Sequence, residues 1–112
     1  MNTVYTIIPT TDFLTDLKKL SKLHKSIIKD IDATAQELKS NPFVGTSLGK
    51  NCYKVRVRIQ SLGKGKRSGA RLITCVKVVK STVYLIALYD KNMWDAIPDA
   101  ELKARLKQIP SS

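Results

Sequence analysis

YKVRVRIQSLGKGKRSGARLIT, from Tyr53 to Thr74, is the most strongly patterned stretch of this chain. Its first half alternates apolar and polar residues with a period of two, which is typical of a strand with one buried face. A basic turn punctuated by glycines follows, and the chain then becomes apolar again. The stretch therefore predicts two strands joined by a hairpin loop.

Cations occupy the polar positions of the first of these strands. Lys54, Arg56 and Arg58 alternate with apolar residues, so their side chains point to the same side of a strand. The ordinary explanation is an exposed edge strand that is charged against aggregation. Arg71 on the next strand adds a further cation, and no acid occurs between residues 53 and 89. This concentration of positive charge favours a surface that binds a polyanion.

The loop between the two strands carries Lys64, Lys66 and Arg67. Its glycines do not match a nucleotide-triphosphate loop, which needs four residues between the glycines and then a helix. A long hairpin loop kept in solution by its charges is the simpler interpretation, and a cationic loop that follows a nucleic-acid backbone is the functional one. The neighbouring basic strand favours the functional interpretation.

The rest of the chain completes an α+β pattern. We expect strands at Thr3–Pro9, Cys52–Gln60, Ala70–Lys80 and Val83–Asp90. We also expect a first helix with Thr10, Thr11 or Asp12 as its N-cap, a second helix from about Lys25 to Ser40, and a closing helix with Leu102, Leu106 and Ile109 facing inward. The last strand is apolar on both faces, which predicts an interior position in the sheet. The order β-α-α-β-β-β-α predicts a helical hairpin packed on a mainly antiparallel sheet, in one domain over residues 1–112.

The net charge narrows the class of partner. Twenty Lys and Arg against nine Asp and Glu give a net charge of +11 and a pI near 9.9, which favours nucleic acid and, second, an anionic membrane surface. No run approaches the ~18 apolar residues that span a bilayer, and the N-terminal residues do not resemble a signal peptide. We therefore expect a cytoplasmic protein without a membrane partner, with Cys52 and Cys75 as free thiols.

Few residues outside the basic half suggest chemistry. His24 is the only histidine and lies among lysines, so it is expected at the surface rather than in a catalytic site. One histidine and two separated cysteines predict no metal site, and nothing suggests a cofactor. Trp94 follows the last strand and either closes the core or stacks on a base beside the cationic face. Tyr89 has the same two alternatives, with the core favoured.

The segments CYKVRVRI, GKGKRSGARLI and VYLIALYDKN resemble the RelE/HigB group of bacterial type II toxins, within the RelE/ParE superfamily. The resemblance covers residues 48–97 closely and rests on the order of elements elsewhere. It implies a metal-independent, ribosome-dependent mRNA endonuclease (mRNA interferase) that cuts mRNA in the decoding site by attack of a ribose 2′-hydroxyl on the adjacent phosphate. It also implies three kinds of partner: the ribosome with its rRNA, mRNA, and a cognate antitoxin, often with a helix-turn-helix DNA-binding domain.

The resemblance assigns functional positions in this chain. The two strand lysines of the family fall on Lys54 and Arg56, its strand arginine on Arg71, and its late basic position near Lys91 and Asn92. The C-terminal tyrosine that some members use has no counterpart beyond the last expected strand.

The chemistry of RNA cleavage agrees with these positions. An internal hydroxyl attack needs one proton taken, one given, and stabilisation of charge on the phosphorane. We expect Lys54 to transfer the proton, Arg56 and Arg71 to clamp the phosphate through their forked donors, and Lys91 to support them. The residues expected to hold RNA or the ribosome are Arg58, Lys64, Lys66, Arg67, Asn92 and Trp94.

The sequence leaves two alternative functions open. One is a gyrase-inhibiting toxin of the ParE branch, which generally lacks the basic catalytic set. The other is an RNA- or ribosome-binding domain without chemistry, because the late arginine and the tyrosine of the family are missing. Replacement of Lys54 discriminates between a nuclease and a binder, since only a nuclease loses cutting at unchanged ribosome affinity.

Overall fold

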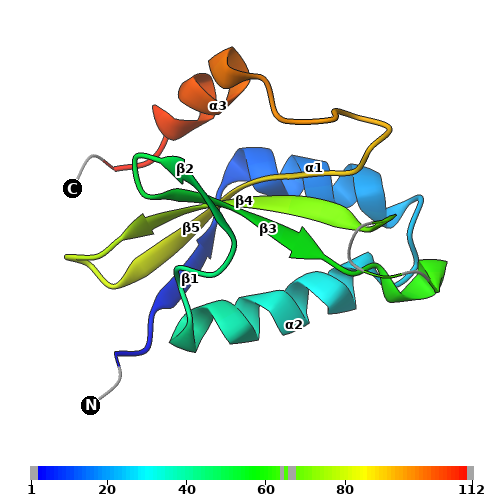
Figure 1. Cartoon of the computed structure of the whole chain (residues 1–112), viewed down its shortest axis with the longest axis horizontal. Helices are drawn as coiled ribbons and strands as arrows, with labels where there is room; N and C mark the ends of the chain where they lie inside the picture. Colours follow the sequence, from blue (N-terminus) through cyan, green and yellow to red (C-terminus); the bar gives the residue numbers. More distant parts are fainter. Residues whose placement is uncertain (1–2, 64, 66–67, 111–112) are drawn as a thin grey trace.

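The computed structural model describes residues 3–63, 65 and 68–110, and its centre is a five-stranded sheet in the order β1-β5-β4-β3-β2 (Figure 1). The elements are β1 (Thr6–Pro9), α1 (Thr11–Ser21), α2 (Ile27–Ser40), β2 (Thr46–Gly49), β3 (Cys52–Val57), β4 (Ala70–Lys77), β5 (Thr82–Tyr89) and α3 (Asp99–Leu106). β1 runs parallel to β5, and the other neighbouring strands are antiparallel. The predicted α+β class and mainly antiparallel sheet are confirmed.

Helical segments cover both faces of the sheet. The predicted hairpin of α1 and α2 buries Phe13, Leu20, Ile27 and Leu38 in one cluster with Val55, Leu72 and Leu88 of the strands. On the other face, half-buried side chains of segment 93–109 pack over Ile73, Ile86 and Tyr89. Figure 1 shows α3 and α2 on opposite sides of the strands. The α3 cover is the thinner one, because this helix has no buried residue of its own.

β5 is the interior strand that its apolar sequence predicts. All eight of its residues are buried, and it pairs with β1 on one side and β4 on the other. The pairing with β1 ends at Pro9 opposite Leu85. Thr10 continues the hydrogen bonding to β5, because its amide and its hydroxyl both donate to the Leu85 carbonyl, at 3.1 and 2.8 Å.

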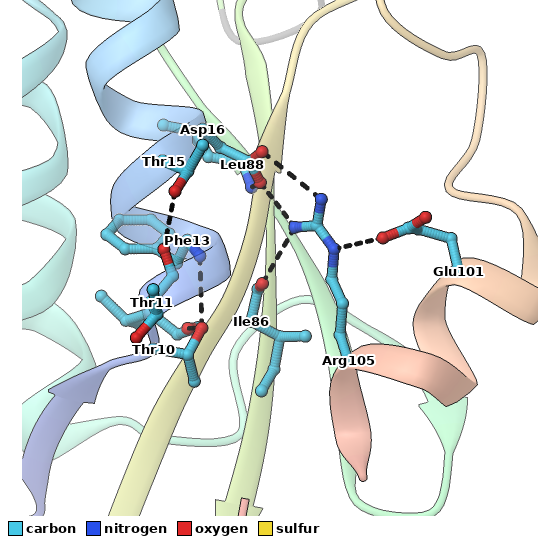
Figure 2. Close-up of polar contacts among 10 residues, drawn as sticks. Thr10, Thr11, Phe13, Thr15, Asp16, Ile86, Leu88, Glu101 and Arg105 are labelled. Carbon is cyan, nitrogen blue, oxygen red and sulfur yellow. Dashed lines mark hydrogen bonds and ion pairs between the residues drawn. The ribbon is translucent and has the colours of Figure 1, made fainter. Parts of the chain in front are cut away.

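Thr10 is also the N-cap of α1. Its Oγ1 accepts a hydrogen bond from the Phe13 amide at 3.2 Å (Figure 2). A threonine oxygen in this position satisfies one of the amides that the first turn of a helix leaves unpaired. Of the three candidates that the sequence offers for this cap, the structure selects the first.

Several boundaries differ from the prediction. β3 ends at Val57 rather than Gln60, because residues Gln60–Leu62 form a 3₁₀ turn whose first amide donates to Asp30 Oδ2 at 3.2 Å. Arg58 therefore lies just beyond the strand. β4 ends at Lys77 rather than Lys80, and α2 begins at Ile27 rather than about Lys25.

β2 is not among the strands that the sequence predicts. Its four residues are all exposed, so it has no apolar alternation by which a strand is recognised. It forms because Lys50 and Asn51 adopt positive φ angles of 54° and 63°, which turn the chain back so that Thr46 pairs with Lys54. The β2–β3 pairing ends at Lys54, and among the described residues no strand lies beside the outer edge of β3 beyond it.

Two glycines permit close contacts along β3. A Cβ on Gly45 would lie 2.4 Å from the Lys54 carbonyl oxygen, and one on Gly69 would lie 2.0 Å from that of Val57. Contacts this short exclude any side chain without a backbone shift. Gly69 directly precedes β4, so this approach helps to set β4 beside β3.

Candidate nucleic-acid interface

The central feature of the site is a cross-strand pair of arginines. Arg56 on β3 lies directly opposite Arg71 on β4. The Val76 amide donates to the Asn51 carbonyl at 2.9 Å, which makes Asn51 and Val76 a hydrogen-bonded pair at the start of the β3–β4 ladder. Hydrogen-bonded and non-hydrogen-bonded pairs alternate along an antiparallel ladder, so Arg56 and Arg71, five positions further, are a non-hydrogen-bonded pair. Side chains at such pairs are the closest in an antiparallel sheet, with Cα atoms about 4.5 Å apart.

Like charges directly opposite each other destabilise a sheet. The structure shows the electrostatic result at Arg71, whose pKa is lowered by burial and then by the positive charge of Arg56. Arg56 is exposed and Arg71 is half-buried, so both side chains are accessible to solvent. An anion bound here would remove the repulsion, and the forks of two arginines suit phosphate oxygens.

Lys54 lies on the same sheet face, two residues before Arg56 and opposite Ile73. It is half-buried and lines a cleft of about 170 Å³ with Tyr89, Ile97 and Leu102. The alternation of the sequence predicts a shared face for Lys54 and Arg56, and the register of β3 with β4 adds Arg71 to that face.

We call Arg56 and Arg71 the arginine row, and Tyr89 on β5 lies next to it, opposite Arg71. Its ring is almost fully buried, at 1% exposure, and it packs edge-on against Trp94 with ring centres 5.5 Å apart. Burial raises the pKa of its hydroxyl, although the backbone of Ile97 and the charge of Arg71 act in the opposite direction. Tyr89 is therefore a core residue beneath the cationic face, in agreement with the favoured interpretation.

Lys91 and Asn92 are exposed in the turn that follows β5. Asp90 holds this turn, since its carboxylate accepts from the Asn92 amide at 3.0 Å and its carbonyl accepts from the Met93 and Trp94 amides. The turn thus places Lys91 two residues beyond Tyr89, the last residue of β5.

The prediction of a surface position for His24 was wrong. Its side chain is only 12% exposed, and its Nε2 lies 3.2 Å from Asp90 Oδ2. The reason is tertiary: the link between α1 and α2 packs against the end of β5, where Asp90 is buried. His24 therefore helps to hold the turn that carries Lys91.

The remaining predicted contacts occupy different surroundings. Arg58 is exposed, just past the end of β3. Trp94 is half-buried between the Tyr89 ring and the Arg105 guanidinium, whose Cζ lies 5.7 Å from the indole centre. Lys64, Lys66 and Arg67, the cations of the hairpin loop, lie outside the described residues.

Three buried acids were missed from the sequence: Asp16, Asp30 and Asp90. The carboxylate of each accepts a hydrogen bond from a backbone amide, and Asp16 also forms an ion pair with Arg105. Its Oδ2 accepts from the Leu88 amide at 3.0 Å and from Arg105 at 2.6 Å (Figure 2). Their only signal is position, since Asp16 and Asp30 interrupt the buried faces of their helices. With three of nine acids inside, the exposed surface is more cationic than the composition suggests.

Among the described residues, no three His, Cys, Asp or Glu side chains form a group that could hold a metal ion. Within the same residues, no helix combines the length and the apolar character needed to cross a bilayer.

Comparison with known proteins defines the class of fold. No model of a protein family matches the chain, and no curated protein matches it. Solved structures of RelE toxins do match over nearly their whole length, which confirms the resemblance to RelE-type toxins at the level of the fold.

Three of these structures illustrate the match. A free Escherichia coli RelE variant, with two arginines replaced by alanine, has a TM-score of 0.62 and 20% identity, covering 96% of this chain and 99% of its own. The intact E. coli RelBE toxin–antitoxin complex gives 0.60 and 21%, covering 77% and 95%. A RelBE complex from Mycobacterium tuberculosis gives 0.59 and 21%, covering 78% and 98%. At these identities the likeness describes the fold alone.

Proposed function

We propose that this protein is the toxin of a type II toxin–antitoxin system and acts as a ribosome-dependent mRNA endonuclease. The observation that carries the proposal is the Arg56–Arg71 pair beside half-buried Lys54, on a fold shared with RelE toxins. Two arginines in a close cross-strand pair cost stability unless an anion neutralises them. A phosphate of single-stranded RNA is the anion that the net charge of +11 would attract.

The proposed chemistry uses side chains alone. The ribose 2′-hydroxyl attacks the adjacent phosphorus, and the 5′-oxygen of the next nucleotide leaves. Lys54 takes or gives the proton at one of these oxygens, while Arg56 and Arg71 bind the charge that builds on the equatorial phosphate oxygens. The buried hydroxyl of Tyr89 is poorly placed to exchange protons with RNA, which makes Lys54 the first candidate for proton transfer.

Other cations would bind the substrate without chemistry. Lys91 supports the phosphate clamp from the turn after β5, and Arg58 and Asn92 extend the contact along the RNA or the ribosome. The antitoxin of such a toxin would present an acidic surface to the same face, since covering the arginine row both neutralises it and excludes RNA.

A cell-free translation reaction tests the proposal. Message ends are mapped by primer extension with the wild-type protein, Lys54→Ala, Arg71→Ala and, as a matched control, Lys80→Ala on the exposed β4–β5 turn. Cuts within codons that need ribosomes, vanish in the first two variants and persist in Lys80→Ala would support it. Cutting without ribosomes would contradict the ribosome dependence.

Two other results would replace the proposed function. If translation stops while the message stays intact, the protein blocks the ribosome without cutting. If translation is unaffected, a supercoiling assay with gyrase tests the ParE-like alternative.

A further inference from the structure

Two thiols meet on the sheet face that α3 covers. Cys52 on β3 lies directly opposite Cys75 on β4, and both are free. Asn51 and Val76 form the hydrogen-bonded pair next to them, and the two kinds of pair alternate along an antiparallel ladder. Cys52 and Cys75 are therefore a non-hydrogen-bonded pair, as Arg56 and Arg71 are. The Cα separation of about 4.5 Å at such a pair falls within the range that a disulfide spans.

We propose that Cys52 and Cys75 form an oxidisable thiol pair, which a hydroperoxide converts into an intramolecular disulfide between β3 and β4. The bond would join residues 23 positions apart in sequence, one pleat from Lys54. Formation of this bond would leave the backbone in place, because the partners already face each other at the closest kind of pair.

The surroundings favour reaction at Cys75. The Cys52 thiol lies within reach of two acceptors, the Lys50 carbonyl at 3.7 Å and the Cys75 sulfur. Donation to the sulfur, with help from the charge of Lys77, lowers the pKa of Cys75 to about 7 despite burial. The same hydrogen bond and burial raise the pKa of Cys52. The pair therefore has one thiolate-forming member and one that stays protonated.

Disulfide formation between Cys52 and Cys75 needs no reactant other than the peroxide. The Cys75 thiolate attacks a peroxide oxygen, so an S–O bond forms, the O–O bond breaks, and the leaving oxygen is protonated to water or an alcohol. The Cys52 sulfur then attacks the sulfenic sulfur of Cys75, the S–O bond breaks, and hydroxide leaves with the Cys52 proton as water. Two thiols lose two electrons and two protons, and the peroxide is reduced.

Access to the pair depends on α3. Both cysteines are almost fully buried, at 1% and 2% exposure, under a cover that includes half-buried Leu106 and Ile109. Buried thiols are normally inert. Here the cover is a short helix with no buried residue, attached through the Arg105–Asp16 ion pair, so local opening is the step that admits the oxidant.

Hydrogen peroxide treatment of the full-length protein tests the proposal. Intact mass, thiol titration and non-reducing peptide mapping are compared for wild type, Cys52→Ser and Cys75→Ser. The wild type should lose the mass of two hydrogens and both titratable thiols, reversibly with dithiothreitol, and its Tm should rise by about 10 °C from the closed loop. Each serine variant should retain or over-oxidise its single thiol without an internal crosslink.

A second arm tests access. Arg105→Ala should speed disulfide formation about tenfold, and low urea should do the same in wild type if that variant does not fold. Thiols that remain reduced both in Arg105→Ala and in wild type in low urea would overturn the proposal. So would separate oxidation of each sulfur, or crosslinks only between molecules.

Discussion

Arg105 in α3 donates hydrogen bonds to both carboxylate oxygens of Asp16 in α1, at 2.6 and 3.4 Å, across the edge of β5. The same guanidinium donates to the Ile86 carbonyl at 3.2 Å and to Glu101 at 2.8 Å (Figure 2). The β4–β5 register skips Ile86, which makes it a bulged residue of β5. The Arg105 side chain thus hydrogen-bonds the irregular part of β5 and attaches α3 to α1.

Arg105→Ala should lower the free energy of unfolding by about 3 kcal/mol, because it leaves the buried Asp16 carboxylate without its counter-ion. Urea unfolding at neutral pH measures the change. Lys103→Ala on the same helix is the matched control, since its ion pair with Asp99 is exposed and should contribute nothing measurable. Equal effects in the two variants would contradict the role assigned to Arg105.

Arg71→Ala should reduce single-turnover cleavage on the ribosome by about 100-fold, the usual cost of one transition-state donor. Arg56→Gln should lose activity as well, yet its unfolding midpoint should be slightly higher than that of wild type, because the cross-strand repulsion is gone. Opposite signs for activity and stability distinguish a ligand site from a structural pair. A drop in both would contradict the assignment.

Binding of single-stranded RNA should weaken steeply with salt. If the face contacts about five phosphates, the slope of log K against log salt is about −3.5, and Arg71→Ala reduces its magnitude by about 0.7. Fluorescence anisotropy with a labelled oligonucleotide measures both slopes. A slope near zero would contradict the polyanion surface.

Gly69→Ala should destabilise the fold by about 2 kcal/mol, because the new Cβ would lie 2.0 Å from the Val57 carbonyl oxygen and force β3 and β4 apart. Gly65→Ala is its control in the same loop, since a Cβ there meets nothing within 4 Å. Thermal unfolding of both variants gives the comparison. A tolerated alanine at residue 69 would show that the strand approach is adjustable.

The reaction of Cys75 with peroxide should rise with pH and reach half its maximum at a pH of about 7, because only the thiolate reacts and the pKa of Cys75 is lowered to about 7. Cys52→Ala removes the hydrogen-bond donor that is the largest cause of this shift. The midpoint should then move to higher pH. Stopped-flow measurements across the pH range test this, and an unchanged midpoint would contradict the thiol contact.

Local sequence patterns predicted much of the fold. Alternation in residues 53–59 placed Lys54 and Arg56 on one strand face, and the apolar run of β5 predicted its interior position. Thr10 was among the predicted caps of α1. These features can be predicted locally, because the spacing of apolar residues within one strand or helix shows which of its faces is buried.

Contacts between residues of different elements could not be predicted from these patterns. Periodicity cannot show that Arg56 lies opposite Arg71, since a slip of one residue in the register would exchange the two faces. It gives no sign of β2, whose residues are all exposed, or of the His24–Asp90 contact.

The amino-acid sequence alone predicts the cationic strand face, the order of most elements and a net charge that suits an RNA partner. Only the packed structure paired Asp16 with Arg105, 89 residues apart, and brought the thiols of Cys52 and Cys75 into contact. The physical reason is that such contacts depend on strand register and on how helices dock, which are properties of the whole chain. Local spacing reports only which side of each element is buried.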